Sequence, residues 1–335
     1  MTATLPPCPA APLDAVGAPL LGAFAGAHAA VDLATLAGRG LGGRLPHLAR
    51  AKTWVWATAV SDEVLAAVAI VEAGYFAGGF AWGLDPRSGA LLFEASAAGL
   101  PGLTARVAPR ASGPARLSAR GLAVELAPEG GALVLRARGP GFSLEAALAL
   151  EGAPAPFTLV VPVPGAGVRV TTKRAALAAG GRVTTGGRAR SLDGGTGGLD
   201  FTAGILARDT SWRWAYATGH AAGAPFGFNL CEGFGVPPGD PGENAAFLRA
   251  PYRLPPVAFE VGGATAPWRV ASADGALDLR FAPRSAHAEA RDLGLVSTRF
   301  VQVGGSFEGV LPGPDGAPIR VAGVPGVVED HRARW

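Results

Sequence analysis

Asp200 is the acidic residue whose position best suits acid chemistry. It follows the glycine-rich stretch Gly194–Gly198, which reads as a flexible turn, and it starts a segment expected to form a strand. A carboxyl group that enters a barrel interior loses solvation, and this raises its pKa toward the range of a general acid near neutral pH. Asp200 is therefore the candidate catalytic acid. The alternative is an aspartate that accepts backbone hydrogen bonds in a loop.

Rare polar residues gather in one short stretch after Asp200. The chain has two Asn, one Gln (Gln302) and two Lys against 27 Arg, a pattern typical of a GC-rich genome that replaces AT-rich codons. Residues that survive such replacement are enriched for positions that need them. Asn229 is the candidate catalytic partner of Asp200, and Cys231 and Asn244 are candidate substrate-binding residues. The amides can orient a hydroxyl or carbonyl group, or they can hold a turn.

The two lysines receive different interpretations. Lys173 is predicted to place a cation at the mouth of the second barrel, near a substrate, although a solvated surface position is the alternative. Lys52 precedes a core strand, so its stem is expected to pack while its charge stays in water.

Aromatic residues alternate along the segment after Asp200. Trp212, Trp214 and Tyr216 lie at every second position, so one face of a strand carries all three. They are candidates to line a cavity and to stabilise a carbocation with their π-faces, or they are core. Glu232 is a further candidate for substrate binding, although it is expected on the opposite face from Asn229 or at the strand end.

An internal repeat is visible in the sequence. Trp54-Val-Trp56-Ala-Thr-Ala in the first half matches Trp212-Arg-Trp214-Ala-Tyr-Ala in the second, 158 residues later, and Glu72 precedes Glu232 by 160. Duplicated core strands indicate a duplicated domain. We predict an N-terminal domain over residues 1–165 and a C-terminal domain over residues 166–335. The Pro- and Gly-rich segment 152–167 is the expected connection.

The elements that position these residues are predicted to be strands. Gly (50) and Pro (29) are too frequent for long helices, and short apolar segments recur between turn signals. We predict an all-β chain with two tandem calycin (lipocalin)-like antiparallel β-barrels and an irregular N-terminal segment that holds one short helix over residues 32–37. Barrels close their own edges, which favours a monomer or a weak homodimer.

Several function classes are disfavoured. The net charge is only +3 and no basic stripe occurs, so nucleic acid is not expected as a partner. The five His and two Cys lack metal-ligand spacing, so no metal is predicted. The G-x-G-x-x-G match at residues 38–43 has no strand before it, and no cofactor is predicted. The apolar stretch 20–33 is interrupted and short, so we expect no membrane span. Two cysteines cannot build a disulfide framework, so we expect a cytoplasmic location.

The chain resembles the bacterial family known as domain of unknown function 2804. The blocks that carry the resemblance run in order through most of the chain: KTWVWATAVSDE, AGYFAGGFAWGLD, the Lys173 strand, Leu199-Asp200, SWRWAYATG, PFGFNLCEGFG, Glu243-Asn244, APWRV and GVVEDHRARW. Two positions depart from the family pattern. Thr172 stands where Asn is frequent, and Phe201-Thr202-Ala203 stands where Trp and Arg often follow the aspartate.

The family is in turn similar in layout to the two-barrel proteins around carotenoid hydratase, hydroxyneurosporene synthase and tocopherol cyclase. That similarity implies a cofactor-free enzyme of hydratase, cyclase or isomerase type that moves protons on an apolar, isoprenoid- or lipid-like small molecule. The alternative is a lipid or isoprenoid carrier without chemistry, because small barrels hold single apolar ligands. An enzyme needs a buried acid beside a polar partner, whereas a carrier needs only apolar walls.

Strand geometry gives one specific expectation for the site. Asn229 and Cys231 share one face of their strand, and Phe228 and Leu230 share the other. We expect Asn229 and Cys231 to face the lumen of the second barrel together with Asp200.

Overall fold

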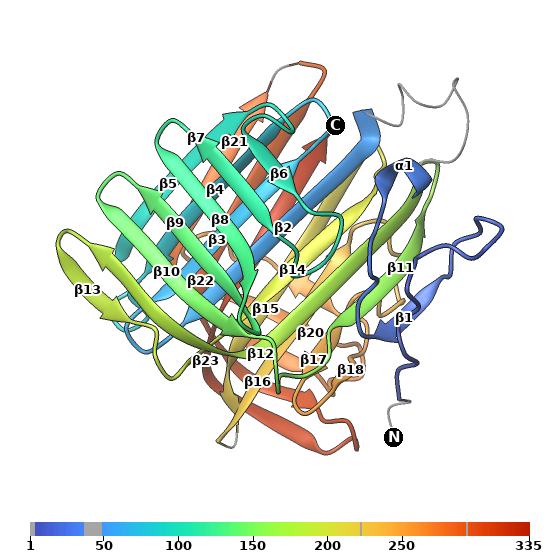
Figure 1. Cartoon of the computed structure of the whole chain (residues 1–335). Coiled ribbons are helices and arrows are strands. Elements are labelled where there is room, and N and C mark those ends of the chain that lie inside the picture. The colour runs from blue at the N-terminus through green and yellow to red at the C-terminus, as the bar shows by residue number, and fades with distance from the viewer. Residues whose placement is uncertain (1–3, 37–48, 222, 293) are drawn as a thin grey trace.

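The computed structural model describes residues 4–36, 49–221, 223–292 and 294–335. The G-x-G-x-x-G match at residues 38–43 and the last residue of the predicted helix lie outside these ranges. Within them the chain forms two antiparallel sheets (Figure 1).

The first sheet contains fourteen strands. Its main path runs β5-β4-β3-β2-β14-β12-β10-β9-β8-β7-β6, while β11 joins β12 to β1 and β13 pairs with β12. The strands are β1 (Gly22–Ala25), β2 (Ala51–Val60), β3 (Leu65–Glu72), β4 (Ala77–Leu84), β5 (Leu91–Gly99), β6 (Ala105–Val107), β7 (Ala115–Ala119), β8 (Leu122–Glu129), β9 (Ala132–Gly139), β10 (Phe142–Ala149), β11 (Phe157–Val163), β12 (Gly167–Thr185), β13 (Arg188–Ser191) and β14 (Gly195–Ile205).

The second sheet contains nine strands in the order β18-β17-β16-β15-β23-β22-β21-β20-β19. The strands are β15 (Asp209–Ala221), β16 (Ala224–Gly233), β17 (Ala245–Phe247), β18 (Pro251–Arg253), β19 (Ala258–Glu260), β20 (Trp268–Ala271), β21 (Asp278–Asp292), β22 (Ser297–Pro312) and β23 (Pro318–Arg334).

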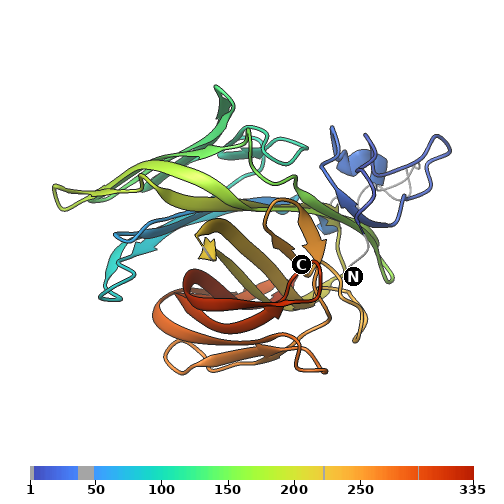
Figure 2. The ribbon, with the colours of Figure 1, turned by 90° about the horizontal axis from the view of Figure 1, so that it is seen from below.

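Each sheet curls around an apolar core of its own. In the first sheet β6–β8 come back against β3–β5, and Leu, Val and Ala side chains fill the space between them. The interior of the second sheet is filled by large side chains such as Phe228, Trp268, Phe281 and Phe307, all fully buried. One sheet forms a nearly closed barrel and the other a half-barrel, stacked one on the other (Figure 2). The predicted all-β class with two calycin-like barrels is confirmed.

The short helix is also confirmed. Helix α1 (Leu33–Leu36) is capped by Asp32, whose carboxylate accepts hydrogen bonds from the Ala34 N–H and the Thr35 hydroxyl. No helix within the described residues is long and apolar enough to cross a membrane.

The long strands β12 and β14 belong to the first sheet, although they follow residue 165. They do so because β14 pairs with β2 along its length, from Thr196 opposite Val60 to Ile205 opposite Ala51. Sheet membership therefore changes between Ile205 and Asp209. The division at residues 165 and 166, as a boundary between units that fold independently, stays a prediction.

The segment 152–167 was wrongly interpreted as a connection. Its apolar centre forms β11, which pairs with β12 on one side and β1 on the other. The glycine-rich stretch before Asp200 is likewise strand rather than a flexible turn, since β14 starts at Gly195. A Cβ on Gly198 would overlap the Tyr216 hydroxyl, so glycine is required there for the two sheets to approach.

The expectation that the Lys52 charge stays in water is wrong. Lys52 is fully buried, and its ammonium donates to the carbonyl groups of Ala49 and Ala73. Its Nζ lies 5.0 Å from the ring centres of Tyr75 and Trp335. Burial lowers the pKa of Lys52 to about 7.

Candidate functional site

A cavity lies between the two sheets and not inside either barrel. It has a volume of about 370 Å³ and takes its walls from strands of both sheets. Deep in it lie Asp200 and Lys173, and its rim includes Tyr75 and Trp335. The expectation that Asp200 faces the lumen of the second barrel is therefore wrong, because that lumen is filled by phenylalanine and tryptophan side chains.

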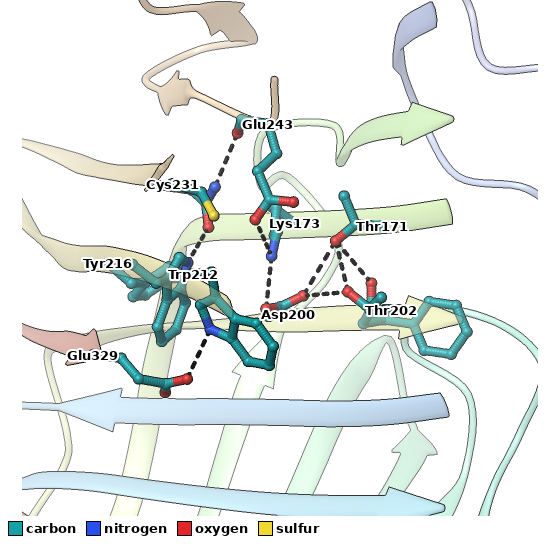
Figure 3. A network of polar contacts seen from close by, with 12 residues as sticks. Thr171, Lys173, Asp200, Thr202, Trp212, Tyr216, Cys231, Glu243 and Glu329 are labelled. Atoms are coloured by element: carbon teal, nitrogen blue, oxygen red, sulfur yellow. Dashed lines mark hydrogen bonds and ion pairs between the residues drawn. The ribbon is translucent and has the colours of Figure 1, made fainter. Parts of the chain in front are cut away.

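Four ionisable side chains form a buried network at one wall. Figure 3 shows Lys173, Asp200 and Glu243 of this network. Lys173 on β12 lies opposite Asp200 on β14, with 2.6 Å between Lys173 Nζ and Asp200 Oδ2. The same Nζ lies 2.9 Å from Glu243 Oε1, and the other oxygen of Glu243 accepts from Arg169. When Asp200 is ionised, the two cations and two carboxylates of the network balance in charge away from water. Removing one partner of such a network would leave an uncompensated buried charge.

The two carboxylates of this network have opposite pKa shifts. Burial alone would raise the pKa of Glu243, but Lys173 and Arg169 lower it to about 2. Burial raises the pKa of Asp200, the Lys173 ammonium opposes that rise, and the nearby charges of Glu243 and Glu329 add to it. Glu243 is the ionised partner of the two cations, and Asp200 is the carboxyl group that holds a proton most readily.

The threonines beside Asp200 are compatible with a protonated acid. The Thr171 and Thr202 hydroxyls lie 3.4 and 3.3 Å from Asp200 Oδ1, and they are 2.8 Å from each other. A hydroxyl can accept as well as donate, so Asp200 Oδ1 has partners in either protonation state.

The two W-x-W strands meet face to face across the cavity. Trp54 stacks on Trp212 with 6.0 Å between ring centres, and Trp56 meets Trp214 edge-on at 4.9 Å. Phe234 packs against Trp54 and Trp212, and its ring lies 3.8 Å below the Arg169 guanidinium. Phe234 adopts a left-handed φ of 57°, which is rare for a side chain of this size.

A second polar group lies on the opposite wall of the cavity. Glu329 accepts a hydrogen bond from Trp212 Nε1 (2.9 Å) at one oxygen and from Gln302 Nε2 (2.9 Å) at the other. The Gln302 carbonyl accepts from the indole N–H groups of Trp56 and Trp82 in the first sheet. This chain of hydrogen bonds ties the two sheets together at the cavity.

The remaining predicted residues have distinct positions. Cys231 lines the cavity, and burial raises its pKa well above the usual value, so the thiol is neutral. Asn229 shares that strand face but lies behind the wall, where it accepts from Trp214 Nε1 (2.7 Å) and donates to the Glu243 carbonyl (2.9 Å). Asn244 accepts from the Cys231 N–H.

Glu232 and Tyr216 lie away from the cavity. Glu232 is part-exposed on the other face of its strand, where it pairs with Arg213 at 2.9 Å. This agrees with its expected orientation but separates it from Asp200. Tyr216 is buried between the sheets and donates to the Arg174 carbonyl at 2.7 Å. Trp212 and Trp214 do line the cavity.

Sequence reasoning missed several residues of the site: Arg169, Glu243, Gln302, Glu329, Trp54, Trp56 and Phe234. One signal was available, because Gln302 is the single glutamine of the chain. Within the part of the chain that the structure describes, no group of three or more His, Cys, Asp or Glu side chains could hold a metal.

Comparisons with known proteins agree with this architecture. The family model described as domain of unknown function (DUF2804) matches residues 27–335. No curated protein matches the chain. A crystal structure with the provisional name AttH from Nitrosomonas europaea is 14% identical, with a TM-score of 0.53, and the match covers 84% of this chain and 92% of that one. Kievitone hydratase from Nectria haematococca is 12% identical, with a TM-score of 0.50, and the match covers 87% of this chain and 92% of that one. At these identities the likeness is one of fold.

Proposed function

This chain belongs to the DUF2804 family, and from that premise we propose that it is an acid–base enzyme of hydratase, cyclase or isomerase type. Its substrate is an apolar, isoprenoid- or lipid-like small molecule that occupies the cavity between the sheets. Asp200 is the acid that gives a proton to the substrate.

One observation carries the proposal: a buried carboxyl group with a raised pKa lines a cavity whose walls also carry the aromatic side chains of Trp56, Trp212 and Trp214. Asp200 is 7% exposed, and Lys173 holds one of its oxygens at 2.6 Å. Burial raises the pKa of the Asp200 carboxyl group, and a raised pKa is the direction that a general acid needs to protonate a carbon–carbon double bond.

The surrounding residues have supporting roles in this proposal. Lys173 and Glu243 fix the position of Asp200, and Asn229 orients Trp214 and the Glu243 backbone. A proton from Asp200 to one alkene carbon leaves a cation on the other, and the faces of Trp212 and Trp214 lie beside it. The cation then accepts water, closes on a second double bond or loses another proton. The reactants are the acid, the substrate and water, so the step uses no cofactor.

The fold neighbours support the reaction class. Kievitone hydratase is by its name a hydratase, and its fold covers most of this chain. A carrier without chemistry is the second candidate, since aromatic and apolar side chains make up most of the cavity wall. The buried network around Asp200 favours the enzyme, because a carrier gains nothing from burying ionisable side chains.

The test compares ligands retained by the wild type and by Asp200→Asn, both purified from the native host and analysed by native mass spectrometry. If Asp200 is the acid, the variant retains the substrate and the wild type retains the product or releases it. A mass difference of one water between the two ligands identifies a hydratase, and equal masses with different chromatographic retention identify a cyclase or isomerase. The same ligand at the same occupancy in both proteins supports the carrier, and no apolar ligand in either contradicts the proposal.

A further inference from the structure

We infer that Glu329 is the proton acceptor that works opposite Asp200. This inference deepens the proposed function and rests on it. It makes the cavity a two-carboxylate site in which one wall gives a proton and the other takes one.

The first argument is the sheet register. In the first sheet Trp56, Asp200 and Lys173 lie directly opposite one another on β2, β14 and β12. In the second sheet Trp214, Glu329 and Gln302 lie directly opposite one another on β15, β23 and β22. We call these sets the Asp200 row and the Glu329 row.

The two rows are counterparts in sheet register. Glu329 follows Asp200 by 129 residues and Gln302 follows Lys173 by the same offset (329 − 200 and 302 − 173), whereas Trp214 follows Trp56 by 158. Both carboxylates line the one cavity, so the two sheets bring acidic residues at equivalent register positions to opposite walls of the same space. Their charges interact, since Glu329 contributes to the raised pKa of Asp200.

The second argument is the hydrogen bonding of Glu329. An indole N–H can only donate, so the oxygen bonded to Trp212 Nε1 is an acceptor. The Gln302 carbonyl is occupied by two indole N–H groups, so the amide nitrogen faces Glu329 and donates to its other oxygen. Both oxygens of Glu329 therefore act as acceptors, as the carboxylate form requires. Asp200 Oδ1 accepts from the Thr171 and Thr202 hydroxyls at the longer distances of 3.4 and 3.3 Å.

The proton balance of the inferred reaction closes with water as the second reactant. Asp200 gives its proton to one alkene carbon, and water adds to the carbon that becomes cationic. Glu329 takes a proton from that water, so a hydrogen and a hydroxyl are added across the double bond. Proton transfer from Glu329 back to Asp200 through solvent restores both groups. In an isomerisation Glu329 takes the proton from a neighbouring carbon instead.

The test uses 5-nitrobenzisoxazole, a flat apolar probe for a base in an aromatic cavity. A base takes the proton on C3, the C–H electron pair forms the nitrile, and the N–O bond breaks to give a coloured phenolate. Binding is followed separately by quenching of tryptophan fluorescence. General-base catalysis is worth about 10²–10⁴-fold in rate, so we expect kcat to fall about 100-fold in Glu329→Gln with KM within about twofold.

Two further variants keep the result interpretable. Glu329→Asp retains a carboxylate but withdraws it from the cavity, so kcat should lie between the wild type and Glu329→Gln. Asp330→Asn is the matched control, because Asp330 is the next residue of β23 and its side chain points to the other face. It should turn over the probe as the wild type does. Circular dichroism and thermal unfolding check that each variant is folded.

The outcomes separate this inference from the proposed function. If both Glu329 variants bind the probe and turn it over at the wild-type rate, Glu329 is not the base. The role proposed for Asp200 is then unaffected. A loss in Asp200→Asn with Glu329→Gln unaffected assigns the base to Asp200, and this too overturns the inference. A wild type that neither binds nor turns over the probe contradicts the apolar cavity, and with it both proposals.

Discussion

The Asp200 row and the Glu329 row share a backbone register and differ in the partner of the carboxylate. In the Asp200 row the partner is Lys173, 1% exposed and bonded to two carboxylates. In the Glu329 row it is Gln302, fully buried and neutral. The two sheets thus place two acids at equivalent register positions in one cavity, and the residue opposite the acid is a cation in one row and a neutral amide in the other. The difference teaches that the chemistry of the site depends on these partners more than on the strands.

The largest effect is expected from replacing Lys173 with glutamine, the residue that stands at the equivalent register position of the Glu329 row. Lys173→Gln leaves Asp200 and Glu243 with Arg169 as their one remaining cation. Breaking a buried ion pair costs about 3–5 kcal/mol, and we expect a loss of that size in the free energy of unfolding. Chemical denaturation at neutral pH measures it. Lys173→Arg keeps the charge and should lose less; equal losses in the two variants would show that the charge is not the cause.

The next effect concerns the pH dependence of stability. The pKa of Glu243 is about 2 in the folded protein against a usual value of 4.5, so its contribution is present above pH 4.5 and is lost as the pH falls toward 2. Its size is on the order of 3 kcal/mol. Asp200 acts with the opposite sign, because its pKa is raised: its contribution is present below its usual value of 3.8 and is lost as the pH rises through the folded value.

Free energies of unfolding measured from pH 2 to 7 test both signs. Glu243→Gln should flatten the loss of stability below pH 4.5, and Asp200→Asn should leave that loss in place. If the wild type and Glu243→Gln lose the same free energy of unfolding below pH 4.5, that loss does not come from Glu243.

A smaller effect is expected in the Glu329 row, because Gln302, the residue opposite Glu329, is neutral. Gln302→Met keeps the volume but removes the acceptor for Trp56 and Trp82 and the donor to Glu329. Buried groups left without partners cost about 1–3 kcal/mol, and thermal and denaturant unfolding should show a loss in that range. A loss as large as that of Lys173→Gln would contradict the distinction between the rows.

The smallest effect separates Trp212 from its repeat counterpart. Trp212 donates to Glu329, whereas Trp54 makes no side-chain hydrogen bond among the described residues. Trp212→Phe should therefore cost about 1 kcal/mol more than Trp54→Phe in denaturant unfolding, since both variants lose a similar stacking area. Equal costs would mean that the hydrogen bond to Glu329 contributes nothing to stability.

The sequence predicted the strands and their duplication because both leave local signals. Alternation and turn residues mark the strands, and the W-x-W match marks the repeat. It did not predict that β12 and β14 complete the first sheet, because the pairing of β14 with β2 joins segments more than a hundred residues apart. The Pro- and Gly-rich composition around β11 also concealed a strand.

The sequence predicted only part of the site, because rare residue types leave a local signal and contacts between the two sheets do not. Asp200, Lys173 and Cys231 stood out by type, rarity or position, and all three line the cavity. Glu329 lies near the polar C-terminal end of β23. Which residues face it depends on how the two sheets pack, and the sequence alone does not give that packing. Asn229 was assigned the correct face, but that face meets the other sheet rather than a lumen.

The stacking of Trp54 on Trp212 and the edge-on contact of Trp56 with Trp214 have a consequence for the symmetry of the molecule. Each tryptophan touches its own repeat counterpart, which is the contact pattern of an isologous two-fold interface between identical subunits. At these tryptophans the covalent chain thus has the contact pattern of a fused homodimer. A half of the chain produced alone would present a self-complementary aromatic face, and it would bury that face by pairing with a second copy of itself.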